Sequence, residues 1–103
     1  MRLSEIKGER VFEAVADIIG PVADIAQDEH ARKMFDAEGG PFAERVKANL
    51  PALLRDHSEE FASIIAVING TTAEEYMAEV TLPKLFSDVF ELLTDKEFAS
   101  FFD

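Results

Sequence analysis

Two histidines, His30 and His57, are the side chains in this sequence best suited to acid–base or metal chemistry. Each has acidic neighbours, such as Asp28 for the first and Glu60 for the second, and imidazole with carboxylate suits several metal cations. Neither histidine belongs to a His-x-x-x-His or His-Glu-x-x-His spacing, which would place two ligands on one helix face. Because 21 of the 103 residues are acidic, such neighbours arise by chance. We therefore expect a capping or solvent-exposed role for both and no metal site.

Other motifs with a known chemistry are missing from the sequence. Gly39-Gly40 is not followed by the Lys-Ser/Thr of a phosphate-binding loop, and Ser58 and Ser63 lack the motif of a nucleophile elbow. Carboxylate pairs could support acid–base catalysis, but any fold of so acidic a chain brings some of them together. We expect a protein that is not an enzyme and that binds no cofactor.

The charge of the chain restricts its partners. The net charge is −11, and residues 51–103, with three basic and eleven acidic residues, contribute −8 of it. Nucleic acids and anionic membranes are bound through lysine and arginine, so neither is an expected partner. A strongly negative charge suits a basic partner, or a protein that stays dissolved while it exposes an apolar surface.

Length and composition indicate one globular domain spanning residues 1–103, with 48% hydrophobic and 30% charged residues. The sequence has no cysteine, no apolar leader at its start and no apolar run long enough to cross a membrane. The cytoplasm is the expected compartment.

Apolar residues recur with helical spacing along most of the chain. In residues 8–28 a stripe runs at alternating spacings of four and three, formed by Val11, Val15, Ile18, Val22 and Ile25. Gly20-Pro21 interrupts this segment, so we expect a kink or two short helices in line. Pro51 is expected to kink or end a further helix in residues 42–57.

The dipeptide Asn69-Gly70 decides between two fold classes. Between apolar strands it would predict a hairpin. The preceding Phe61, Ile64, Ile65 and Ile68 have helical rather than alternating spacing, so glycine is expected to end a helix there. A Thr-x-x-Glu capping box from Thr72 then begins the next helix.

The last third of the chain is unusually apolar. Residues 82–93 carry leucine, valine and phenylalanine over more than one narrow helix face, and a cap from Thr94 is expected to begin a last short helix. We expect Phe98 and Phe101 in the core. In sum, the sequence predicts an all-α protein, a single compact domain of about six short helices.

The sequence also resembles the tail assembly chaperones of long-tailed (siphovirus-type) phages and prophages of Gram-positive bacteria. The resemblance lies in four stretches in this order: MRLSEIKGERVFEAVADIIGPVADIAQDE, IIAVINGTTAEEY, TLPKLFSDVFELLTD and FASFF. It implies a non-enzymatic helical protein of the host cytoplasm that is not expected in the mature virion. Such chaperones bind and solubilise the tape-measure protein while the major tail (tube) protein polymerises around it.

A chaperone for amphipathic helices needs apolar surface of its own, and the apolar stripe of residues 82–93 is wider than one core face requires. We therefore expect partner binding or self-association through Leu82, Leu85, Phe86, Val89, Phe90, Leu93 and Phe102. Three other functions stay open: another small phage structural or connector protein, an acidic helical regulator that binds a basic protein, and a small hydrolase.

Overall fold

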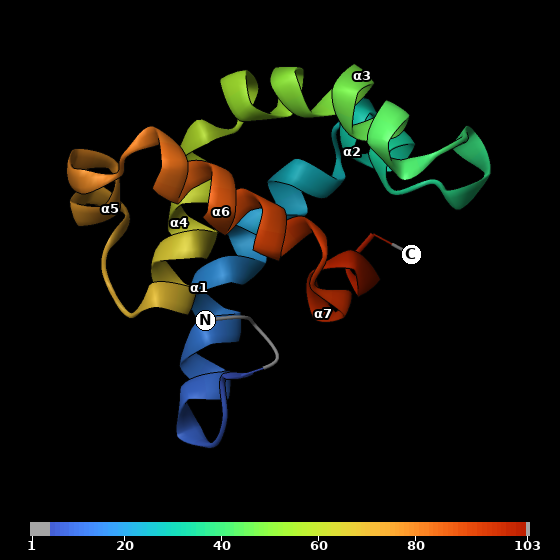
Figure 1. Ribbon diagram of the computed structural model, residues 1–103. Helices are drawn as coiled ribbons and strands as arrows, with labels where there is room; N and C mark the ends of the chain where they lie inside the picture. Colours follow the sequence, from blue (N-terminus) through green and yellow to red (C-terminus); the bar gives the residue numbers. More distant parts are fainter. Residues whose placement is uncertain (1–4, 103) are drawn as a thin grey trace.

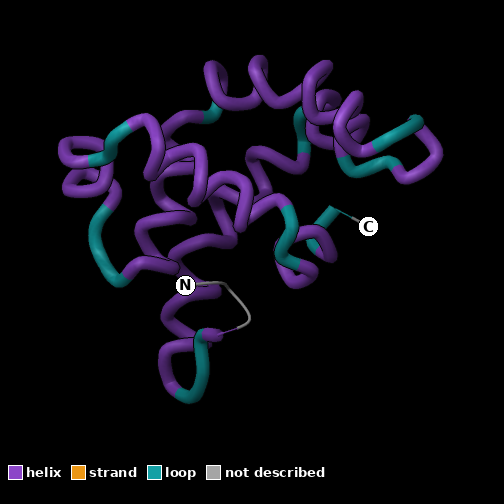
Figure 2. The backbone as a smooth tube through the Cα atoms, in the orientation of Figure 1, coloured by secondary structure: helices purple, strands orange, loops and turns teal. Residues whose placement is uncertain are grey.

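The structure, a computed structural model, describes residues 5–102. Its helices are α1 (Glu9–Ala26), α2 (Glu29–Met34), the 3-10 turn Ala37–Gly39, α3 (Phe42–Asp56), α4 (Ser58–Asn69), α5 (Ala73–Glu79), α6 (Leu82–Leu93) and α7 (Lys96–Ser100). No strand occurs in this range, and short loops join the helices (Figure 2). The all-α prediction is confirmed, with seven α-helices where about six were expected. The radius of gyration, 13.2 Å, is that of one compact domain of this length.

Helix α4 forms the centre of the core. It packs along α1 and against α5 and α6, while α2 and α3 pair with each other at the other end of the molecule (Figure 1). Its buried side chains are Phe61, Ala62, Ile64, Ile65, Ala66 and Ile68. The predicted stripe of α1 faces this core from Ile18 to Ile25, but Val11 and Val15 are 40% and 45% exposed. The first two turns of α1 therefore have apolar residues that the core does not cover.

Neither internal proline ends its helix. Pro21 lies inside α1 and Pro51 inside α3, and both helices continue past them. Of the two alternatives expected at each proline, a kink or an interruption, the interruption is therefore ruled out: α1 is not two helices in line, and α3 does not end at Pro51. Each proline costs its helix one amide donor, and packing of the apolar residues on both sides of it compensates.

The helix stop at Asn69-Gly70 is confirmed. Gly70 has φ 73° and ψ 29°, the left-handed conformation that glycine adopts without strain. Its neighbour Thr71 donates a backbone hydrogen bond of 2.9 Å to Ala66, which closes the helix end. Thr72 then caps α5, because its hydroxyl accepts a 3.1 Å bond from the Glu75 amide.

The C-terminal helix differs from its prediction in two ways. The N-cap is Asp95, whose carboxylate accepts a 2.9 Å bond from the Glu97 amide, whereas Thr94 ends α6 by donating to the Phe90 carbonyl. Phe98 is fully buried, as predicted, but Phe101 is 48% exposed and not in the core. Aspartate is a stronger cap than threonine, which explains the shift by one residue.

An aromatic cluster ties the C-terminal segment to α2. Phe102 stacks on Phe35, with ring centroids 4.4 Å apart and an angle of 9° between the planes. Phe98 meets both rings edge-to-face, at 5.9 Å from Phe35 and 5.1 Å from Phe102. Stacked and edge-to-face pairs at these distances are typical of aromatic side chains. In the described range, no helix has both the length and the apolar character needed to span a bilayer.

Candidate functional site

Helix α6 has two apolar sides, and only one of them faces the core. Val89 and Leu93 are 5% and 4% exposed, whereas Leu82, Phe86 and Phe90 are 75%, 70% and 57% exposed. The exposed three follow one another at i, i+4 and i+8, so they form one line along the outer face of the helix. The wide apolar stripe of the sequence is thus split between core and solvent.

This outer face borders a groove whose opposite wall is α3, the helix that runs above α6 in Figure 1. The groove, called here the α3–α6 groove, has a volume of about 140 Å³. All of its lining residues are apolar: Val46, Leu50, Leu82, Leu85, Phe86, Val89, Phe90 and Leu93. Leu85 also lines a neighbouring hollow between α5 and α6, bordered by Tyr76 and Met77. The apolar surface therefore continues past the groove toward α5.

Six of the seven residues predicted for partner binding lie together in this groove. Leu82, Leu85, Phe86 and Phe90 form its accessible wall, and the buried Val89 and Leu93 form its floor. The seventh, Phe102, lies apart in the aromatic cluster with Phe35. It is half-buried there, and its stacking on Phe35 explains its apolar character without a partner.

The rotation of α6 about its axis is fixed by polar contacts on its inner side. The Tyr76 hydroxyl donates a 2.7 Å hydrogen bond to Oδ2 of the buried Asp88, and Lys84 Nζ donates a 2.8 Å bond to Oδ1. Burial is the main reason why the pKa of Tyr76 lies well above its usual range, and the hydrogen bond to Asp88 adds to it. With Asp88 held inward, the line from Leu82 to Phe90 points outward.

The other wall, α3, is held by polar side chains to α2 and to the loop that joins the two helices. Arg45 Nη1 donates a 2.8 Å bond to the Met34 carbonyl, and its Nε donates a 3.0 Å bond to the Gly40 carbonyl. Asn49 accepts a 3.1 Å bond from His30 Nδ1, because the amide oxygen can only accept. These bonds and the close packing of the two helices attach α3 to α2.

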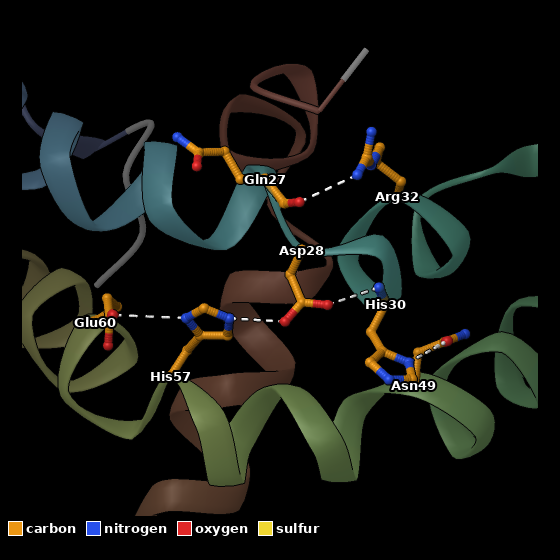
Figure 3. A network of polar contacts seen from close by, with 7 residues as sticks. All are labelled: Gln27, Asp28, His30, Arg32, Asn49, His57 and Glu60. Carbon is orange, nitrogen blue, oxygen red and sulfur yellow. Dashed lines mark hydrogen bonds and ion pairs between the residues drawn. The ribbon is translucent and has the colours of Figure 1, made fainter.

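His57 connects this pair of helices to the rest of the core (Figure 3). It lies at the corner between α3 and α4, and its Nε2 donates a 2.8 Å bond to Oδ2 of Asp28, the N-cap of α2. Its buried Nδ1 makes no hydrogen bond but lies 3.5 Å from Oε1 of Glu60. A protonated ring thus directs an N–H at each of two carboxylates, whereas a neutral ring leaves one buried nitrogen unsatisfied.

The pKa values of this pair follow from these contacts. Burial alone would lower the pKa of His57, but the hydrogen bond to Asp28 and the Glu60 carboxylate outweigh it, so the pKa is raised. The pKa of Asp28 is lowered, mainly by the hydrogen bond from the His30 amide and then by His57. Both shifts favour the ion pair over the neutral forms.

We expect the stability of the protein to fall as the pH rises from about 6.5 through the raised pKa of His57, because His57 stabilises the fold only while it is protonated. The lowered pKa of Asp28 keeps its own contribution intact above about pH 4. Urea unfolding of His57→Gln should show a loss of about 1 kcal/mol at pH 5.5 and a flatter profile toward pH 8. If the free energy of unfolding of His57→Gln depended on pH as steeply as that of the parent protein, this role would be contradicted. The control is His30→Gln, which replaces the other histidine in the same way.

Sequence reasoning missed part of the groove and a second surface. Val46 and Leu50, which form the α3 wall, were not among the residues predicted for partner binding; both are half-buried and also pack against the core. On α1, Phe12 and Ile19 are 82% and 62% exposed. The adjacent apolar pairs Val11-Phe12 and Ile18-Ile19 would have indicated that the helix is too apolar for a single buried face.

Within residues 5–102, no three histidine or acidic side chains are placed to hold one metal ion. No protein-family model, no curated protein and no solved structure matches the chain, so the family expected from the resemblance stays a prediction.

Proposed function

We propose that this protein is a phage tail assembly chaperone and that the α3–α6 groove binds an amphipathic helix of the tape-measure protein. One observation carries the proposal: Leu82, Phe86 and Phe90 form an exposed line beside a hollow lined only by apolar residues. The resemblance of the sequence to such chaperones indicates which partner this surface serves. The host cytoplasm, during tail assembly, is the proposed place of action.

The exposed rings offer apolar area whose burial would favour binding. A phenylalanine side chain has about 200 Å² of surface, so the open parts of Phe86 and Phe90 amount to roughly 250 Å². Covering that area stabilises a complex by about 6 kcal/mol at about 25 cal/mol per Å², before the costs of association. A client helix inserts its apolar side chains at i, i+3, i+4 and i+7, the mode by which grooves bind helices.

The charge of the chain is compatible with the proposed chaperone role. The net charge of −11 makes copies of the protein repel one another, which keeps complexes with exposed apolar surface from clumping. No carboxylate lines the groove itself, so an apolar client meets no desolvation cost from it. The negative surface and the apolar groove thus have separate roles.

Replacing both Phe86 and Phe90 with glutamate is expected to abolish co-purification with the tape-measure protein encoded in the same tail gene cluster. The two side chains lose apolar contact and place charges in the groove, which should weaken binding by at least about 30-fold. The measurement is co-expression with a tagged tape-measure protein, followed by affinity purification. Circular dichroism checks that the helices remain, as expected for side chains that are mostly exposed.

Phe12→Glu/Ile19→Glu is the matched control, since it makes the same chemical change on exposed residues of α1 outside the groove. It should leave co-purification unchanged. Loss with both double variants would overturn the groove as the site, and unfolding of Phe86→Glu/Phe90→Glu would show that these rings belong to the core. If the parent protein itself does not co-purify, the chaperone function is wrong. Mass spectrometry of purified virions should lack the protein, whereas a connector subunit would be present.

A further inference from the structure

The α3–α6 groove is small for the partner proposed for it. Its volume of about 140 Å³ is close to that of a cavity that holds one benzene ring, about 150 Å³. A helix that docks through positions i, i+3, i+4 and i+7 brings several side chains to the surface that it covers. As it stands, the groove has room for about one of them. A client helix that inserts more than one side chain therefore needs a wider groove, and one wall has to move.

The α6 wall is fixed to the core. Val89 and Leu93, on its inner side, are 5% and 4% exposed. The hydrogen bond of 2.7 Å from the Tyr76 hydroxyl to Asp88 holds the inner side of the same helix. Moving α6 outward would expose the two apolar side chains and break a bond to a buried carboxylate, which is costly. Widening is therefore expected at the other wall.

The α3 wall belongs to a pair of helices, called here the α2–α3 hairpin and comprising residues 29–56. Helix α3 packs far more closely against α2 than against α6, and the pair lies together at one end of the molecule (Figure 1). The bonds from Arg45 to the Met34 carbonyl and from His30 to Asn49 both lie within the hairpin. The hairpin can therefore shift as a unit while these contacts stay intact.

Both chain connections of the hairpin meet at one place. Asp28 comes directly before α2 and His57 directly after α3, and the 2.8 Å bond between their side chains joins the two connections across 29 positions (Figure 3). The hairpin is also held at the end of α2, where Phe35 stacks on Phe102. That contact leads to α7, a helix of five residues joined to α6 through residues 94–95. The polar bond is thus the contact nearest to the two points about which the hairpin would turn.

We propose that the α2–α3 hairpin is a hinged wall of the groove, which widens when the hairpin rotates about Asp28 and His57, and that the bond between these two side chains is the latch that keeps it closed. Hinges are typically a few residues at element ends that absorb the change in backbone angles. The short helix α7 moves with the hairpin and keeps its contact with Phe35. The purpose of the movement rests on the proposed function, because a client helix that binds the wide form shifts the protein toward it. The movement itself belongs to the protein alone.

The latch responds to the protonation of His57. Two carboxylates face its ring, Asp28 before α2 and Glu60 on α4, at 2.8 and 3.5 Å. The other histidine nearby, His30, bonds to Asn49 inside the hairpin. A protonated His57 directs an N–H at each carboxylate, whereas a neutral ring directs a lone pair at one of them. Because the pKa of His57 is raised, the latch is complete below about pH 6.5 and weakens as the pH rises through that pKa.

The test measures the width of the groove in the full chain with spin labels. The sequence has no cysteine, so labels attach only where cysteine is introduced. Lys47→Cys/Ser87→Cys labels exposed positions on the two walls, and Glu13→Cys/Ser87→Cys labels exposed positions of α1 and α6 as the reference. Double electron–electron resonance gives the distance distribution of each pair. As the pH rises from about 5.5 to about 9, part of the Lys47–Ser87 distribution should move to longer distances by a few ångströms, while the Glu13–Ser87 distribution stays unchanged.

Three substitutions separate the latch from its surroundings. His57→Gln should give the longer Lys47–Ser87 distances already at about pH 5.5, because glutamine cannot carry the charge. Asp28→Asn keeps a good N-cap for α2 but loses the carboxylate charge, so it should shift the distances in the same direction. His30→Gln changes the other histidine, within the hairpin, and should leave both distributions unchanged. Circular dichroism checks that each variant is helical.

Unchanged Lys47–Ser87 distances in His57→Gln, in Asp28→Asn and across the pH range would overturn the hinge. An equal change in the Glu13–Ser87 pair would also overturn it, since the whole molecule would then be loosening. Co-purification with the tape-measure protein tests the proposed function separately. Unchanged distances beside intact co-purification would refute the hinge alone, and lengthened distances without co-purification would refute the chaperone function alone.

Discussion

Phe98→Ala is expected to lower the free energy of unfolding by about 3–5 kcal/mol. The Phe98 ring is fully buried, and it meets Phe35 and Phe102 edge-to-face in the aromatic cluster. Alanine removes the ring from an apolar site and leaves a cavity that neighbouring rings fill only in part. A domain of this size is typically stable by about 5–15 kcal/mol, so much of the total would be lost. Urea unfolding followed by circular dichroism measures the difference.

Phe101→Ala provides the matched control, because Phe101 lies three positions further along and is 48% exposed. Its replacement should cost no more than about 1 kcal/mol, and less if solvent already covers most of the ring. Similar losses of stability for both variants would contradict the packing described here, in which Phe98 is buried and Phe101 is exposed.

Removing both donors to Asp88 is the second large effect expected. The double variant Tyr76→Phe/Lys84→Met leaves a buried carboxylate without the two bonds of 2.7 and 2.8 Å that now hold it. An unpaired buried charge typically costs about 3–5 kcal/mol. Each single variant should cost less, about 1–3 kcal/mol for Tyr76→Phe, because one donor remains.

A double-mutant cycle tests whether the two donors act on the same group. The loss in the double variant should exceed the sum of the single losses, since only there is the carboxylate left without any partner. Asp88→Asn in the same background should recover part of the stability by removing the charge. Additive losses, with no recovery from asparagine, would show that Asp88 is solvated and does not fix the rotation of α6.

Local patterns were enough to predict the helical fold. Glycine after the apolar run from Phe61 to Ile68 ends α4, and the predicted threonine cap at Thr72 begins α5. Each of these signals depends on residues that lie close together in the sequence. The ends of these helices can therefore be predicted without knowing how the helices pack.

The division of α6 between core and groove could not be predicted in the same way. The width of the apolar stripe indicates an excess, and six of the seven chosen residues do lie in the groove. Which side turns inward depends on Asp88 meeting Tyr76 and on the position of α3, contacts between residues on different helices. The choice between a kink and an interruption at Pro21 and at Pro51 stayed open for a related reason, because tertiary packing rather than the local preference of proline decides whether the helix continues.

The stacking of Phe102 on Phe35 has a consequence for the order of events during synthesis. The two rings are 67 positions apart in the chain, and Phe98 covers the same site. Because synthesis proceeds from the N-terminus, Phe35 is made well before Phe98 and Phe102, and these rings cannot cover it until they have been added. The site on Phe35 is therefore completed by residues that are synthesised late relative to α2.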